Sequence, residues 1–255
     1  ILDKNYRLED TVDLFPGESL RIPKKIKTDL EASTIIQYKN REHLMVAGSA
    51  SRPEREYVML FPLDSLHTYE KITTQPFVAR LRSMGMKPVN FEGLAAVKNM
   101  LVFGNRGNLK RQDNHFVVVP VSLVTDMENS SPHLIDFNLS EDGQFKGVSG
   151  LAYVETLDLM LFTASIEDTD NEIDDGGIGN SYLGYITSFS ERMNDGTIRP
   201  DVLWNLSGMQ AEFVNEKIES VTVESVGSEL ILHLVADNDN GTSTLFKVSL
   251  TNPLR

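Results

Sequence analysis

Three glutamates and one serine occupy the same position in four similar stretches of this sequence: Glu31, Glu92, Glu219 and Ser149. Each residue stands near the start of an apolar run of strand length, and two further such runs follow it. Repeated units that circle a common axis bring equivalent side chains together at one mouth of a central channel. Carboxylates that converge there must be ion-paired, protonated or bound to a cation, because like charges raise each other's pKa.

Oxygen-rich side chains in this arrangement favour a hard divalent cation. Two second runs end in Asn105 and Asp237, and Asp239 follows shortly after the latter. We therefore expect Ca²⁺ or Mg²⁺ to be held by members of one set: Glu31, Glu92, Asn105, Asp237 and Asp239.

Catalytic and ligand-binding roles fall to residues around the same mouth. Glu92 and Glu219 are the candidates for proton transfer, and Arg106, in an Asn-Arg-Gly-Asn loop, suits a bidentate grip on a carboxylate or phosphate. Glu167, from an acidic loop, and Asn238, from an Asp- and Asn-rich turn, are expected to contact the ligand.

Each assignment has a structural alternative. A repeated glutamate also suits a latch that accepts backbone hydrogen bonds from the neighbouring unit. The turn at 237–241 also suits an ordinary reversal, since Asp, Asn and Gly dominate turns, and Arg106 also suits neutralisation of a glutamate. The histidines form no metal-binding pattern, and no nucleophile elbow, phosphate loop or dinucleotide fingerprint is present.

The repeated units predict the fold. Almost no helical periodicity separates the apolar runs, so tandem four-stranded units indicate an all-β protein, a β-propeller of antiparallel blades in a single domain over residues 1–255. Besides a partial unit at about 1–14, units are expected at about 29–88, 90–139, 147–208 and 217–250. Fourth strands are expected in three of them, at Phe77–Leu81, Leu134–Leu139 and Val202–Leu206.

The number of blades depends on the first fourteen residues. Residues 1–14 look like two strands joined by a turn, as in the outer half of a blade, and unit 217–250 lacks its own fourth strand. If residues 1–14 belong to a first blade that is incomplete in this chain, there are five blades. If Tyr6–Leu14 completes the last unit, there are four. We favour five.

Composition limits the partners. The chain has 255 residues and a net charge of −13, which argues against nucleic acid or an anionic membrane as the main partner. There is no cysteine, and no apolar run approaches membrane-spanning length. The chain starts at Ile1 rather than Met, so we expect an upstream part that was removed or is not represented, and we favour the cytoplasm over the periplasm. We expect a monomer with a small-molecule ligand in its channel.

Several motifs resemble those of an uncharacterised family of bacterial propellers akin to the SdiA-regulated and phytase-type esterase-like propellers. They are Glu-Gly-Leu-Ala at 92–95, Asn-Arg-Gly-Asn at 105–108, Thr-Ala-Ser at 163–165 and Ala-Asp-Asn-Asp at 236–239. More distantly the chain is similar to gluconolactonase-like, calcium-dependent lactonases. That resemblance implies a cation held by Glu31 or Glu92, Asn105 and Asp237. The chain departs from the pattern, because it has three such glutamates and no clear second asparagine in unit 147–208.

Two functions follow as hypotheses. In the first, the protein is a metal-dependent hydrolase of a small ester, lactone or phosphoester, in which a cation polarises the scissile group and a channel carboxylate acts as base. In the second, it is a non-catalytic propeller that binds a ligand or a protein at its acidic mouth.

Overall fold

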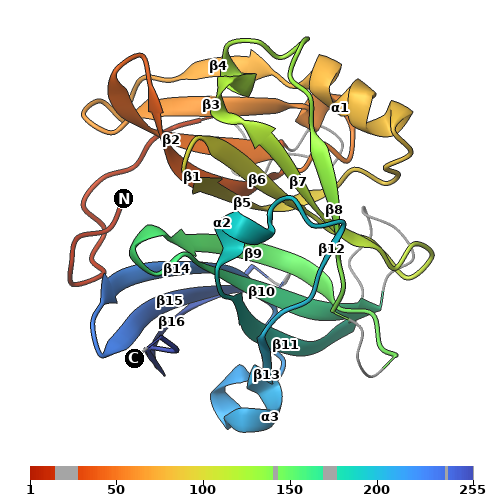
Figure 1. Cartoon of the computed structure of the whole chain (residues 1–255). Helices are drawn as coiled ribbons and strands as arrows, with labels where there is room; N and C mark the ends of the chain where they lie inside the picture. The colour runs from red at the N-terminus through yellow and green to blue at the C-terminus, as the bar shows by residue number, and fades with distance from the viewer. Residues whose placement is uncertain (15–27, 140–142, 169–176, 239–240, 255) are drawn as a thin grey trace.

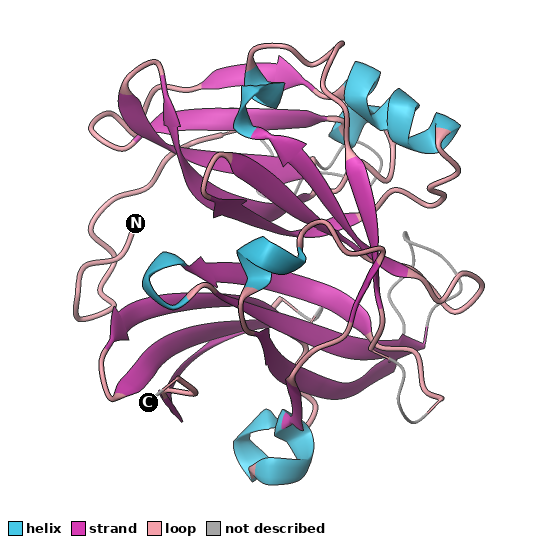
Figure 2. Ribbon diagram, in the orientation of Figure 1, coloured by secondary structure: helices cyan, strands magenta, loops and turns pink. Residues whose placement is uncertain are grey.

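Four β-sheets surround a common centre and form a four-bladed β-propeller (Figure 1). The computed structural model describes residues 1–14, 28–139, 143–168, 177–238 and 241–254. Strands dominate these residues, and the few helices lie on the outside of the sheets (Figure 2). No helix in the described ranges has the length and apolar character needed to cross a membrane.

The first two sheets form one half of the molecule. Sheet 1 has the strand order β1-β2-β3-β4, and its strands are β1 (Leu30–Tyr38), β2 (Arg41–Gly48), β3 (Tyr57–Pro62) and β4 (Glu70–Thr73). Sheet 2 consists of β5 (Phe91–Val97), β6 (Met100–Asn105), β7 (Asn114–Pro120) and β8 (His133–Phe137), with the short β12 (Thr197–Ile198) added parallel to β8. The other pairs in both sheets are antiparallel.

The other two sheets form the second half. Sheet 3 consists of β9 (Gly147–Val154), β10 (Leu159–Asp168), β11 (Gly177–Ile186) and β13 (Val202–Asn205). Sheet 4 has three strands among the described residues, β14 (Ile218–Val226), β15 (Glu229–Asp237) and β16 (Ser243–Thr251). The helices are α1 (Gln75–Ser83), α2 (Phe189–Arg192) and α3 (Leu206–Met209).

The two innermost strands of each sheet form an antiparallel hairpin. Strands β1 and β2 are joined by two residues, Lys39 and Asn40, and both have positive φ angles, of 50° and 61°. Positive φ at both positions matches the twist of the flanking strands, so the turn sets the register of the hairpin.

The hydrophobic core lies between neighbouring sheets rather than in one central mass. Between sheets 2 and 3, Phe116 stacks on Phe137 with ring centroids 4.2 Å apart, and Phe162 meets Phe137 edge to face at 4.9 Å. Similar clusters fill the spaces between sheets 1 and 2 and between sheets 3 and 4. Three junctions of the ring are therefore closed by buried apolar side chains.

The fourth junction, between sheets 4 and 1, differs. Strand β1 packs on β5, β5 on β9, and β9 on β14, but β14 and β1 do not pack on each other in this way in the described structure. The N-terminal segment, residues 1–14, instead runs from sheet 4 to sheet 1 (Figure 1). The hydroxyl of Tyr6 lies 2.8 Å from Nε2 of His233 in β15, and Nε2 of His67 lies 2.7 Å from a carboxylate oxygen of Asp10. We call this open junction the seam.

Three expectations about strands are corrected. Residues 77–81 belong to α1, because Phe77, Val78 and Leu81 share one buried helical face and Pro76 stands at its start. The fourth strand of sheet 1 is the polar edge strand β4. Residues 1–14 form a single bridge between Leu2 and Leu8 rather than two strands, so they complete neither a first nor a last blade. The favoured count of five blades is wrong, and the alternative of four fits.

The other two fourth strands are confirmed, at β8 and β13. Each has the alternating or β-branched character that predicted it, and each pairs with the third strand of its own sheet.

Candidate functional site

Each of the four equivalent residues identified in the sequence is the extra residue of a β-bulge in an innermost strand. In β1, β5, β9 and β14 the register with the second strand slips by one residue, and the extra residue is Glu31, Glu92, Ser149 and Glu219 respectively. A β-bulge bends the strand and re-aims the side chain of the extra residue. The repeat in the sequence is therefore a repeat of one backbone device.

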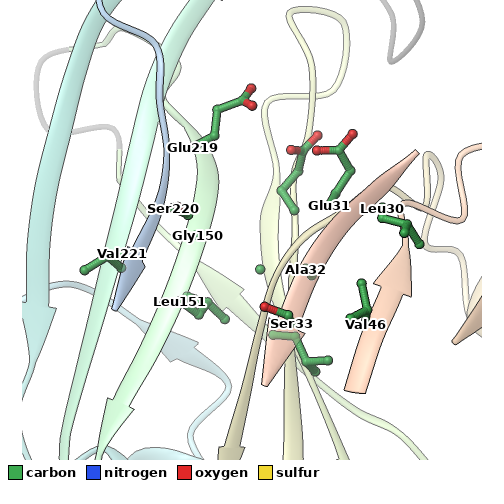
Figure 3. Close-up of a pocket in the computed structure, with 13 residues that line it drawn as sticks. Leu30, Glu31, Ala32, Ser33, Val46, Gly150, Leu151, Glu219, Ser220 and Val221 are labelled. Atoms are coloured by element: carbon green, nitrogen blue, oxygen red, sulfur yellow. The ribbon is translucent and has the colours of Figure 1, made fainter. Parts of the chain in front are cut away.

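Small residues follow each bulge and allow the inner strands to converge: Ala32, Gly93, Gly150 and Ser220. A Cβ atom on Gly150 would overlap with Thr163 and with the backbone of Glu219 and Ser220 in β14. These residues and the three glutamates line a cavity of about 200 Å³. The side chains of Glu31 and Glu219 extend toward the same end of it, while Leu151 lies further along the strands (Figure 3). We call this end the carboxylate mouth.

Glu92 is the member of the carboxylate mouth whose surroundings the structure defines most fully. The side-chain amide of Asn90 donates a hydrogen bond to Glu92 Oε1 over 2.6 Å. The positive charge of Arg106 also acts on Glu92. The Arg106 side chain is buried and lies across Gly147, where any Cβ atom would overlap with it. Gly147 is therefore the position at which the guanidinium passes from sheet 2 toward the mouth.

The pKa of Glu92 is raised from 4.5 to about 7. Burial is the largest cause, because a desolvated carboxylate is penalised, and the neighbouring Glu219 raises the pKa further. The charges of Arg106 and Lys217 and the hydrogen bond from Asn90 lower it in part. Glu92 consequently exchanges a proton in the neutral range.

Glu219 stands in a different environment. Its Oε1 lies 2.9 Å from Nζ of Lys217, and the lysine side chain is almost fully buried. The mouth thus contains one carboxyl that binds a proton near neutral pH and one carboxylate in an ion pair with a lysine.

Each blade has a buried cationic side chain: Arg55, Arg106, Lys146 and Lys217. Arg55 pairs with Asp29, which lies just before β1, at 2.5 Å. The sequence analysis assigned the balancing charge to a divalent cation. In the structure, arginine and lysine side chains supply positive charge to Glu92 and Glu219.

Two asparagines that were expected to bind a metal or a ligand form hydrogen bonds with the backbone. Oδ1 of Asn105 accepts a hydrogen bond from the backbone N–H of Asn90 over 2.7 Å, and its amide donates to the carbonyl of Pro88. Asn238 does the same in sheet 4, where Oδ1 accepts from the N–H of Lys217 over 2.9 Å. Both latches hold the residue two positions before a bulged glutamate. Each of these bonds lies within a single sheet, so it differs from the latch between neighbouring units that the sequence suggested for the glutamates.

The remaining predicted residues do not join the carboxylate mouth as one metal centre. Asp237 is exposed at the end of β15, where its N–H donates to the carbonyl of Lys217. Asp239 and the side chain of Glu167 lie outside the described part of the chain. Within the described ranges, no three or more His, Asp or Glu side chains are grouped so that they hold a metal ion. The expected Ca²⁺ or Mg²⁺ therefore has no support from this geometry.

Two residues of the site escaped the sequence analysis, Asn90 and Lys217. Each stands two positions before a bulged glutamate, and its side chain contacts that glutamate. Alternate residues of an extended chain share one face. The polar residues two positions before Glu92 and Glu219 could therefore have been predicted from the sequence to lie beside these glutamates.

One family model, described as a family of unknown function (DUF6929), matches residues 2–250. No curated protein sequence matches the chain.

Three solved structures are distantly similar. A GH43 glycoside hydrolase engineered to display endo-xylanase and exo-arabinofuranosidase activity is 10% identical, with a TM-score of 0.46 over 86% of this chain and 38% of that one. A xylan β-1,4-xylosidase from Bacillus halodurans C-125 is 12% identical, with a TM-score of 0.43 over 88% and 42%. The Malassezia sympodialis allergen Mala s 1 is 14% identical, with a TM-score of 0.42 over 86% and 76%.

This chain spans about two fifths of the length of the two glycoside hydrolases. Similarity at this level carries no argument about activity. The comparisons add no support for the resemblance to SdiA-regulated or gluconolactonase-like propellers, which stays a prediction.

Proposed function

We propose a function from the site itself, because the chain belongs to the DUF6929 family, whose function is unknown. The protein is a hydrolase that cleaves the acyl C–O bond of a small ester or lactone at the carboxylate mouth, with Glu92 as general acid and base. The observation that carries this proposal is the contrast between two neighbouring carboxyl groups. Glu92 has a pKa of about 7, and Glu219 is paired with a buried lysine.

Carboxyl pairs in unlike environments are the usual basis of acid–base hydrolysis by enzymes. A group with a pKa near the working pH transfers protons most effectively, because both of its forms are populated. In this proposal ionised Glu92 takes a proton from the attacking water, and the protonated acid gives it to the leaving oxygen. Arg106 stabilises negative charge that develops on the substrate.

A metal-dependent version of this chemistry is less well supported. The carboxylates have protein cations beside them, and the described residues offer no group of three metal ligands. We therefore derive no step through a metal ion.

The test is hydrolysis of a panel of p-nitrophenyl esters and lactones. We expect Glu92→Gln to lower kcat/KM by about 10²- to 10⁴-fold, the usual contribution of a general acid or base. The wild-type rate should depend on a group that titrates near pH 7. The matched control is Glu212→Gln, which makes the same change at an exposed position outside the mouth.

Asp237→Asn separates the two versions of the chemistry. If Asp237 belongs to a metal centre, Asp237→Asn should lower the rate strongly, and Ca²⁺ should stabilise the wild-type protein. The acid–base proposal predicts neither result. If no member of the panel is hydrolysed but some stabilise the protein equally with and without Glu92→Gln, the propeller is a binding protein and the proposal is wrong.

A further inference from the structure

A second, larger cavity lies at the opposite end of the channel. Its volume is about 810 Å³, within the range of small-molecule sites, and the innermost strands of all four sheets line it. Because it is built on strands rather than on loops, it is formed before any ligand arrives. We call it the wide end.

The wide end adjoins the carboxylate mouth, and we call the residues that line both cavities the collar. Both cavities share four lining residues, and these are the residues two positions after each bulge: Ser33, Leu94, Leu151 and Val221. The three apolar members are buried, but Ser33 is exposed. The collar is therefore apolar on three sides and open beside Ser33, which faces the seam.

The inner part of the wide end is mostly apolar, and its polar residues, among them Thr34 and Thr222, are uncharged. Ile35 is 52% exposed there, although it lies on an innermost strand, and Ala96, Ala152 and Val223 are only partly buried. The hydroxyl of Thr34 is engaged, since it accepts a hydrogen bond from the N–H of Ala96 over 3.0 Å. These side chains leave apolar surface for a ligand to cover.

The charged residues of the wide end stand at its outer rim, near the hairpins: Glu42, Lys98 and Glu155. Nζ of Lys98 donates to the hydroxyl of Ser190, which donates to Asp158, and Tyr153 also donates to Asp158. The hydrogen bond to Asp158 therefore fixes the side chain of Tyr153 and uses the hydrogen of its hydroxyl. The charge distribution thus suits a ligand whose inner part is uncharged.

We infer that the wide end binds an uncharged, mainly apolar group, and that this group is the unreactive part of the substrate. The second half of the inference rests on the proposed hydrolase function. The scissile bond then lies at Glu92, and the apolar chain passes the collar beside Ser33 into the wide end. The substrate class is an amphipathic ester or lactone with an acyl chain or an apolar ring.

Binding is tested with N-phenyl-1-naphthylamine, a neutral fluorescent probe. We expect saturable binding of one probe per chain and a loss of affinity of about tenfold or more in Ile35→Glu, because a charge in an apolar cavity is costly. The matched control is Leu245→Glu on β16, which is 42% exposed and lies outside the cavity. The inference is overturned if the probe does not saturate, if Ile35→Glu binds it normally, or if both variants lose it equally.

The substrate half is tested with p-nitrophenyl acetate and p-nitrophenyl octanoate. We expect the wild type to prefer octanoate and Ser33→Phe to abolish that preference while still binding the probe, because the ring closes the collar. Hydrolysis without a chain-length preference contradicts the substrate assignment and leaves the hydrolase proposal standing. Probe binding without hydrolysis of either ester contradicts the substrate assignment and confirms the apolar site alone. The substrate panel described above then decides the hydrolase proposal separately.

Discussion

The junction between sheets 2 and 3 and the seam between sheets 4 and 1 join equivalent strands in opposite ways. At the junction, β5 and β9 approach closely, because Gly93 leaves room for Leu151 and phenylalanines fill the space behind. At the seam, alternate residues of the two inner strands are exposed: Ser33, Ile35 and Gln37 in β1, and Ser220, Thr222 and Glu224 in β14. Small residues next to a bulge do not close a junction by themselves, since both regions have them.

The contrast divides the channel into a sealed side and an open side. Glu92 stands on β5, on the sealed side, where burial raises its pKa. Glu31 and Glu219 stand on the two strands that border the seam. The open side gives a ligand a route into the channel, and the sealed side gives the reacting carboxyl a poorly hydrated environment. Changes on the two sides should therefore have unequal effects.

The largest effect is expected from truncation of the sealed core. Phe116→Ala removes a fully buried ring that stacks on Phe137 and should lower the free energy of unfolding by about 3–5 kcal/mol. Ile35→Ala, at the half-exposed seam, should cost less than about 1 kcal/mol. Urea unfolding midpoints give both values. Equal costs would show that the seam is packed in solution.

The next effect concerns the close approach of inner strands. Gly150→Val places side-chain atoms where the backbone of β14 lies and should destabilise the protein by about 2–3 kcal/mol. Ser220→Val makes a β-branched residue at the equivalent, exposed position of β14 and should change stability by less than about 0.5 kcal/mol. Thermal unfolding of the two variants side by side tests the comparison. A tolerated Gly150→Val would contradict it.

The sequence predicted the inner strands better than the outer parts, for physical reasons. Positions such as Glu92-Gly93 repeat because a bulge and a close strand contact recur in every blade, so self-comparison finds them. Lys217 was missed although it stands two residues before Glu219, because the equivalent positions of the other blades hold residues of other types, Asp29, Asn90 and Gly147. Residues 77–81 were wrongly predicted to form a strand, because a short apolar run in the sequence is compatible with a buried helix as well as with a strand. The blade count failed because residues 1–14 alternate like strands but contact side chains across the seam instead of a sheet edge.

A third effect links the sealed side to pH. The folded pKa of Glu92, about 7, lies above its ordinary value of 4.5, so the folded protein binds the extra proton between these pH values. Stability from this group is fully present below about pH 4.5 and is lost as pH rises through about 7. We expect Glu92→Gln to be more stable than wild type at pH 8, by up to about 3 kcal/mol, and similar to it at pH 4.

Urea unfolding at a series of pH values measures this difference, with Glu212→Gln as the exposed control. A difference between wild type and Glu92→Gln that does not change with pH would show that Glu92 is well hydrated, and it would remove the basis for the acid–base role.

The smallest effect is expected at the N-terminal segment that crosses the seam. Its polar contacts, Tyr6 with His233 and Asp10 with His67, are exposed, so they hold the segment without adding to the core. The double variant Tyr6→Phe, His67→Gln should be cleaved faster by trypsin at Arg7, while its global unfolding midpoint stays unchanged. Tyr69→Phe, at another exposed tyrosine, is the control and should match wild type in both measurements.

Acid should loosen the same segment in the wild type. The hydrogen bond from His67 holds the pKa of Asp10 below its ordinary value, so this contact is present above that value and is lost as pH falls through the lowered pKa. Trypsin is inactive in acid, so pepsin digestion or hydrogen exchange of residues 1–14 measures the change. If the double variant instead lowers the global midpoint as much as Gly150→Val does, the segment seals the seam as firmly as packed strands seal the other junctions. The ligand must then enter the channel by another route.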